Sequence, residues 1–221
     1  MAIEIRNYIE HTILKPEATT AEVKQVVQEA IDNKFFGVCI NPNFVELAHD
    51  TIELSASHKP KIVTVVNFPL GANKVETTVA QTKQAIEEGA DEIDTVINLG
   101  ALKSKDYDKV GDDIKKTKEA CADKPLKVIL ETDLLTKDEI VKASEICAKS
   151  GADFVKTSTG FVKGGVGAQV EDVALMYEIV SPFGLNVKAS GGIKTREQAL
   201  ALIEAGATRL GASSGIELVK E

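Results

Sequence analysis

The sequence predicts an α/β protein that forms a single (β/α)8 TIM barrel over residues 1–221. Short apolar runs alternate with amphipathic stretches, at roughly the 25–30-residue spacing of a β–α–β step. One helix-to-strand junction also occurs three times, with a glycine two residues ahead of the strand: Glu88–Asp91, Ser150–Asp153 and Ala205–Thr208. An open, doubly wound sheet is the alternative fold. No Pro-, Gly- or Ser-rich linker divides the chain into halves, so the closed barrel fits better.

Eight runs along the chain are expected to be strands. The first, at His11–Leu14, is the weakest, and the other seven are continuous apolar runs. These are Gly37–Ile40, Ile62–Asn67, Glu92–Asn98, Leu126–Glu131, Asp153–Thr157, Leu185–Ala189 and Thr208–Gly211. The chain has no Trp and only 5% aromatic residues, so its core must consist mainly of Val, Ile, Leu and Ala. Such residues suit parallel strands that are buried on both faces.

The stretches between these runs carry apolar residues at three- and four-residue steps, which is the helical period. The clearest helices are expected at Ala21–Asn33, Lys74–Glu88, Lys137–Lys149 and Arg196–Ala205, with a short last helix at Ile216–Lys220. Three helix starts have the spacing of a capping box: Thr19 with Glu22, Thr136 with Glu139, and Thr195 with Gln198. In each pair a side chain is expected to satisfy a backbone N–H that the helix itself leaves unpaired.

Charge and cysteine content limit the partners and the compartment. The net charge of -8 argues against nucleic acid or an anionic membrane as a partner. The three cysteines form no CxxC pair, so neither a disulfide framework nor a metal site is expected. The first residues lack the apolar core of a signal peptide, and no apolar run approaches the ~20 residues of a membrane span. A reducing cytoplasm is therefore the expected location.

Three ionisable residues stand inside otherwise apolar strand runs: Asp94, Lys156 and Lys188. They fall on the fourth, sixth and seventh predicted strands, and the sixth and seventh are neighbours, so both lysines are expected to reach one cavity. A lysine attacks a carbonyl only when its amine is neutral, and burial or a nearby second cation favours that form. This arrangement predicts a Schiff-base nucleophile at Lys156, a perturbing ammonium at Lys188 and a proton carrier at Asp94.

Each of these residues also has a simpler explanation when it is taken alone. A strand lysine usually extends its amine to solvent at the rim, and a buried aspartate is usually a satisfied hydrogen-bond acceptor. The coincidence of all three on predicted barrel strands favours chemistry.

Two glycine-containing segments predict a phosphate site. Gly191 and Gly192 follow the seventh strand, and the run Gly211–Gly215 follows the eighth. The loops after these two strands are the recurrent phosphate site of a TIM barrel. Bare backbone N–H groups and the hydroxyls of Ser213 and Ser214 suit a phosphate there, although tight turns also require glycine.

Eight ordered motifs extend over nearly the whole chain. They are His11–Pro16, Val38–Pro42, Val66–Gly71, Glu92–Asp94, Val128–Thr132, Val155–Phe161, Val187–Ile193 and Gly211–Gly215. Together they resemble the motifs of the deoxyribose-phosphate aldolase family. The resemblance implies reversible cleavage of 2-deoxy-D-ribose 5-phosphate into D-glyceraldehyde 3-phosphate and acetaldehyde, as part of deoxyribonucleotide catabolism and without a metal or organic cofactor. It assigns the Schiff base to Lys156 and supporting roles to Lys188 and Asp94. It further implies that phosphate contacts come from Gly160, Gly191, Gly192, Gly211, Ser213 and Ser214, and that Thr12 and Cys39 line the acetaldehyde end.

The chain departs from this family at several positions. Glu10 stands where an aspartate is usual, and Phe161 stands where some members have a phosphate-binding lysine, for which Lys163 or backbone donors are expected to compensate. The run 162–169 is less regular than the usual Ser/Thr- and Gly-rich loop. Some members end in a tail with a tyrosine that assists proton transfer; no such residue stands near Glu221, so Asp94 or a water is expected to serve.

Other functions remain open from the residues alone. An aldolase for another phosphorylated sugar or keto acid, or a phosphosugar isomerase, would keep the phosphate site and change the chemistry. A barrel that binds a phosphate ligand without catalysis is a further alternative. Burial of two lysines costs free energy, and binding alone gains nothing from it. Cys39 taken by itself is more simply a small buried apolar residue. A homodimer through the outer helices is the expected assembly.

Overall fold

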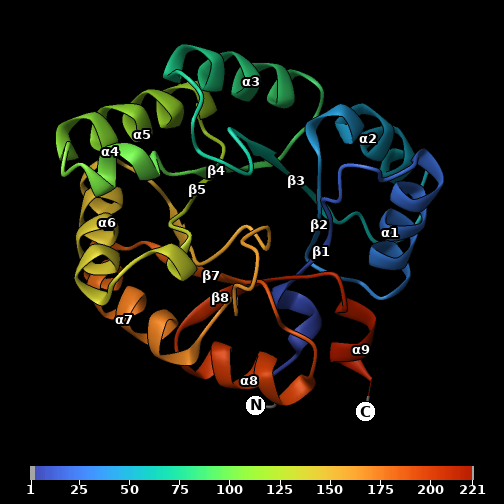
Figure 1. Ribbon diagram of the computed structural model, residues 1–221. Coiled ribbons are helices and arrows are strands. Elements are labelled where there is room, and N and C mark those ends of the chain that lie inside the picture. The colour runs from blue at the N-terminus through green and yellow to red at the C-terminus, as the bar shows by residue number, and fades with distance from the viewer. Residues whose placement is uncertain (1–2, 221) are drawn as a thin grey trace.

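The computed structural model describes residues 3–220, which form a closed parallel barrel with its strands in chain order (Figure 1). The predicted domain also includes residues 1, 2 and 221, which lie outside the described residues. The strands are β1 Ile9–Ile13, β2 Gly37–Ile40, β3 Lys61–Val66, β4 Glu92–Val96, β5 Leu126–Ile129, β6 Phe154–Lys156, β7 Asn186–Ser190 and β8 Ala207–Ala212. The predicted single (β/α)8 barrel is therefore confirmed.

A ring of helices surrounds the strands and covers their outer faces (Figure 1). The α-helices are α1 Thr20–Asp32, α2 Val45–Glu53, α3 Val75–Glu87, α4 Leu99–Lys103, α5 Tyr107–Cys121, α6 Lys137–Lys149, α7 Val170–Val180, α8 Arg196–Glu204 and α9 Gly215–Val219. Four short 3-10 helices lie at Ile5–Tyr8, Pro42–Phe44, Thr132–Leu134 and Ser181–Phe183. No helix within residues 3–220 is long and apolar enough to cross a membrane.

The local signals at the helix ends are confirmed. Each of the three predicted capping boxes forms, with the Thr side chain accepting from the N3 backbone and the N3 side chain accepting from the cap backbone. The three junction glycines all have positive φ, at 110° for Gly89, 83° for Gly151 and 112° for Gly206. These conformations favour glycine because it has no Cβ to clash with the carbonyl.

Some strand boundaries differ from the sequence prediction. The differences occur where the barrel closes, where a side chain caps a helix and where the backbone turns. β1 begins two residues before the predicted start because Ile9 and Glu10 pair with Leu210 and Gly211 of β8, which closes the barrel. β4 stops before Asn98, whose side chain caps α4 instead. β5 stops before Glu131, whose backbone is left-handed with φ 61°.

The strand register decides which side chains share the barrel interior. Lys156 of β6 pairs with Lys188 of β7, and Asp94 of β4 pairs with Lys127 of β5. Residues paired in this way lie side by side on the same face of the sheet. The apolar contact between strands and helices forms the main core, and the barrel interior holds a set of buried charged residues.

Candidate active site

Asp94 is the centre of the charged cluster inside the barrel. Its Oδ2 accepts hydrogen bonds from the Nζ atoms of both Lys156 and Lys188, each at 2.7 Å. Its Oδ1 accepts one from Lys127 Nζ at 3.0 Å. The three residues singled out in the sequence therefore meet at one carboxylate, and both predicted lysines reach the same oxygen.

Glu10 and Glu92 complete this cluster. Lys188 Nζ pairs with Glu10, while Lys127 Nζ lies 2.6 Å from Glu92 Oε2 and 3.5 Å from Glu10 Oε1. Three lysine side chains thus face three acidic side chains inside the barrel. We call these six residues the ion network: Glu10, Glu92, Asp94, Lys127, Lys156 and Lys188.

The ion network fixes the protonation of its central members. Burial by itself would raise the pKa of Asp94, but the ammonium groups of Lys127, Lys156 and Lys188 outweigh it and hold that pKa well below its usual range. Burial would lower the pKa of Lys188, yet the carboxylates of Asp94 and Glu10 raise it above the ordinary lysine value. The same balance raises the pKa of Lys127. Asp94 is therefore an anion and Lys188 an ammonium at neutral pH.

A cleft of about 600 Å³ opens at the carboxyl ends of the strands. Among the three lysines of the ion network, Lys156 is the one that lines it. Seven of the eight predicted substrate-binding residues also line it: Thr12, Gly160, Gly191, Gly192, Gly211, Ser213 and Ser214. The structure thus connects the buried charges to the predicted phosphate loops through the Lys156 side chain.

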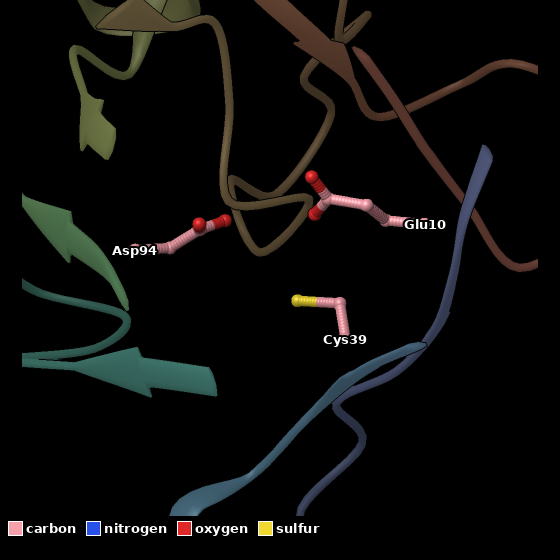
Figure 2. A group of neighbouring side chains, drawn as sticks. All are labelled: Glu10, Cys39 and Asp94. Carbon is pink, nitrogen blue, oxygen red and sulfur yellow. The ribbon is translucent and has the colours of Figure 1, made fainter. Parts of the chain in front are cut away.

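Cys39 is the predicted residue that the cleft lining does not include. It is fully buried, and its Sγ lies within 4.8 Å of carboxylate oxygens of Glu10 and Asp94. Figure 2 shows these three side chains pointing toward one another from β1, β2 and β4. Cys39 therefore lies beside the buried carboxylates rather than in the cleft lining, so contact with acetaldehyde at this position stays a prediction.

The Glu10, Cys39 and Asp94 side chains also have the spacing of a metal site. Both carboxylates already bind the Lys188 ammonium, which supplies a cation at that position. Burial raises the pKa of the Cys39 thiol, which disfavours the thiolate that a metal requires. The group fits an ion network with a small neutral neighbour better than a metal centre.

Glycine is required at the predicted phosphate end of the cleft. Gly160, Gly191 and Gly192 have φ values of 83°, 87° and 74°. A Cβ on Gly192 would lie 2.8 Å from the carbonyl oxygen of Val166. The backbone therefore approaches the cleft in a conformation that a side chain would disturb, as anion-binding loops require.

The sequence-based prediction missed several residues of the site. Lys127 was missed because it stands at the start of an apolar run, where an exposed lysine is common. Lys15 and Lys194 line the cleft and bring positive charge to it. Their positions directly after the first and seventh strands were the available signal.

The expected substitute for a lysine at position 161 is not at the cleft. Lys163 is exposed and is absent from the residues that line it. Phe161 is half-exposed and packs edge-on against Phe68, with ring centroids 5.2 Å apart. Besides Lys156, the lysines that line the cleft among the described residues are Lys15, which pairs with Glu22 at 2.5 Å, and Lys194.

A closed parallel barrel in which one buried lysine borders a cleft of glycine-rich loops is consistent with an aldolase of the lysine-dependent class. The family model described as DeoC/LacD family aldolase matches residues 7–220. The chain belongs to this family.

Relatives of known name agree with that assignment. The chain is 52% identical over 218 residues to the deoxyribose-phosphate aldolase of Finegoldia magna, covering 99% of this chain and 100% of the relative. A putative deoxyribose-phosphate aldolase from Coccidioides immitis has a similar structure, with a TM-score of 0.93 and 38% identity over 97% of this chain and 84% of that one. The deoxyribose phosphate aldolase of Aeropyrum pernix, described as a tetramer, gives a TM-score of 0.83 and 30% identity over 97% and 89%.

Proposed function

We propose that this protein cleaves 2-deoxy-D-ribose 5-phosphate reversibly into D-glyceraldehyde 3-phosphate and acetaldehyde, through a Schiff base on Lys156. In this proposal residues 1–221 act as one catalytic domain of deoxyribonucleotide catabolism. The observation that carries the proposal is the position of Lys156, which joins the ion network at its Nζ and lines the cleft. Curated relatives at about 50% identity bear the name of this activity, which does not favour another phosphosugar or keto acid.

The reaction begins at the Lys156 amine. Its neutral Nζ adds to the aldehyde carbon of the open-chain sugar, and the resulting carbinolamine loses water to give an iminium ion. The C3 hydroxyl then loses its proton, the C2–C3 bond breaks, and its electron pair moves toward the iminium to give an enamine. Glyceraldehyde 3-phosphate leaves at this point. Protonation of the enamine carbon and hydrolysis of the imine release acetaldehyde and restore Lys156.

Asp94 and Lys188 prepare this amine and move its protons. Asp94 accepts a hydrogen bond from Lys156 at 2.7 Å, so its carboxylate lies within reach of protons that enter or leave at Nζ. Lys188 remains an ammonium beside the same oxygen. That ammonium lies beside the oxygen that also binds Lys156, and this position is the basis of the perturbing role proposed for Lys188.

The glycine-rich end of the cleft binds the phosphate. Backbone N–H groups near Gly160, Gly191, Gly192 and Gly211, with the hydroxyls of Ser213 and Ser214, are the proposed donors. Lys194, which lines the cleft after β7, is proposed to add positive charge there. Thr12 and Cys39 are proposed for the acetaldehyde end, Thr12 at the cleft wall and Cys39 behind it. No metal or organic cofactor enters this scheme, since the iminium itself is the electron sink.

Reductive trapping tests the proposal directly. Borohydride treatment with acetaldehyde should leave an N-ethyl group on Lys156, located by peptide mass spectrometry. The matched control is Lys83→Leu on the exposed face of α3, which should be labelled at Lys156 like the wild type. Lys156→Leu should show no label in the corresponding peptide. A label on another lysine of the barrel would reassign the nucleophile.

Cytoplasmic location and a homodimer through the outer helices are part of the same proposal. The three cysteines are free and buried, which suits a reducing compartment. Light scattering after size exclusion measures the assembly, and a molar mass of twice the chain supports the dimer. A fourfold mass, as described for the Aeropyrum pernix relative, would replace it.

A further inference from the structure

The loop between β6 and α7 arches over the mouth of the barrel (Figure 1). Its first part supplies Thr159, Gly160 and Phe161 to the cleft wall. Two acidic residues of the preceding β5–α6 connection, Glu131 and Asp133, hold this loop, and neither takes part in the scheme proposed above. Residues 160–166 are mostly exposed, and besides the packing of Phe161 on Phe68 these two carboxylates hold the loop at its ends.

Glu131 holds the start of the loop. Its carboxylate accepts the backbone N–H of Thr159 at 3.0 Å and also the hydroxyl of Thr159. The Thr159 hydroxyl oxygen in turn accepts the N–H of Phe161 at 3.0 Å. Glu131 is buried, and its backbone adopts the left-handed conformation that a residue with a Cβ rarely takes. Such a conformation persists only where the surroundings impose it, and it often marks a functional position.

Asp133 holds the end of the same loop. Its two carboxylate oxygens accept the N–H groups of Val166 at 2.9 Å and Gly167 at 3.1 Å. A Cβ on Gly165 would lie 2.6 Å from Asp133 Oδ2, so the carboxylate can come this close to the loop backbone only because residue 165 is a glycine. Asp133 therefore binds a turn of backbone that has no room for another side chain.

The end of the loop is in direct contact with the predicted phosphate site. The N–H of Ala168 donates to the carbonyl of Gly191 at 3.0 Å. A Cβ on Gly167 would lie 2.4 Å from the same carbonyl group. A displacement of residues 166–168 would thus move Gly191, or would open a gap beside it.

We propose that Glu131 and Asp133 are positioning residues that fix the two ends of the β6–α7 loop and thereby set the shape of the cleft at its phosphate end. This inference rests on the proposed function, because it assigns the phosphate of the substrate to that end. Glu131 acts through Thr159 and Phe161, and Asp133 acts through residues 166–168 and Gly191. Neither carboxylate touches the reacting atoms.

The inference predicts a loss that is confined to the phosphorylated substrate. Both Glu131→Gln and Asp133→Asn keep the shape of the side chain. Asp133→Asn turns an NH2 group toward a backbone N–H, and Glu131→Gln removes the acceptor of either the Thr159 N–H or the Thr159 hydroxyl. Each should raise KM for 2-deoxyribose 5-phosphate about tenfold and change kcat less than about twofold. The inhibition constant of inorganic phosphate should rise by a similar factor. Trapping of acetaldehyde on Lys156 needs no phosphate and should proceed at the wild-type rate.

Controls separate positioning from damage to the fold. Asp50→Asn and Glu119→Gln remove exposed carboxylates of α2 and α5 and should leave KM unchanged. A double-mutant cycle of Glu131→Gln with Thr159→Val should be non-additive, because both changes break the same contact. If buried Glu131→Gln fails to fold, the less buried Asp133→Asn carries the test.

The outcomes also distinguish this inference from the proposed function. Unchanged KM in both variants, or an equal loss of phosphosugar turnover and of acetaldehyde trapping, would overturn the positioning role. Failure of the wild type to trap acetaldehyde on Lys156 would overturn the proposed function instead.

Discussion

Lys156 and Lys188 donate to one oxygen of Asp94 at the same distance, but they differ in what lies beyond that oxygen. Lys188 is completely enclosed and also pairs with Glu10, so its ammonium is held from two sides. Lys156 borders the cleft. The contrast supports the proposal that Lys156 is the nucleophile and Lys188 its fixed positive neighbour.

Lys156→Leu tests this difference. Turnover should fall by about three orders of magnitude or more, because no other amine of the ion network borders the cleft. Asp94 keeps two ammonium partners, so the circular dichroism spectrum should stay close to that of the wild type. Lys83→Leu provides the matched surface change with normal kcat. Residual activity within tenfold of the wild type would show that Lys156 is not the nucleophile.

Asp94→Asn should give a pH-dependent loss of stability. The pKa of Asp94 is lowered in the folded protein, so ionised Asp94 stabilises the fold above the unfolded value of about 3.9, and this contribution disappears as the pH falls through the folded pKa. Urea unfolding should show a deficit of about 3–5 kcal/mol in the variant at neutral pH, since three buried ammoniums lose a partner. The deficit should shrink below about pH 4. A deficit that is independent of pH would contradict this assignment.

At the scale of elements, helix ends and loops follow rules that the sequence carries locally. The capping threonines and the glycines after α3, α6 and α8 behave as their spacing predicts, because each depends on neighbours within four residues. The loops after β7 and β8 were also predicted at the correct positions. These loops and Lys156 line the same cleft only because strands that are far apart in the chain come together.

Ser214→Ala should act on binding rather than on chemistry. Ser214 lines the cleft after β8, and a contact with the phosphate is made in the ground state and in the transition state alike. Steady-state kinetics should show KM raised about fivefold to tenfold with kcat nearly unchanged. The exposed Ser57→Ala, in the connection before β3, is a control for loss of a hydroxyl. A large fall in kcat at constant KM would contradict the phosphate assignment.

At the scale of the molecule, closure of the barrel assembles three lysines and three acidic residues from five strands into one network. Glu10 comes from β1, Glu92 and Asp94 from β4, Lys127 from β5, Lys156 from β6 and Lys188 from β7. Buried ions are tolerated only when each has a partner, so the network depends on all of these strands keeping their register.

Removal of one charged side chain from this network should therefore destabilise the fold more than removal of a pair of opposite charge. Lys127→Met should lower the free energy of unfolding by about 3–5 kcal/mol, because it leaves an unpaired buried carboxylate. The double variant Lys127→Met/Glu92→Gln restores equal numbers of cations and anions and should recover part of this loss. Urea denaturation measures both, with exposed Lys83→Met as the reference. A double variant less stable than Lys127→Met would show that charge balance is not the cause.

The sequence by itself determined what depends on short-range physics. Apolar periodicity located all eight strands, glycines and caps located the helix ends, and the motif residues Asp94, Lys156 and Lys188 were singled out before any contact was known. Lys127 could not be found in this way, because a lysine at the start of an apolar run has the same local signal whether it is exposed or buried. Its position beside Asp94 follows from the pairing of β4 with β5.

Only the tertiary structure decided which side chains share a space. Strand register and closure placed Cys39 behind the carboxylates, brought Lys15 and Lys194 to the cleft, and set Glu131 and Asp133 against a loop about thirty residues away. The physical reason is that a side chain's face and neighbours depend on hydrogen bonds between segments far apart in the chain, and local sequence pattern carries no record of those partners.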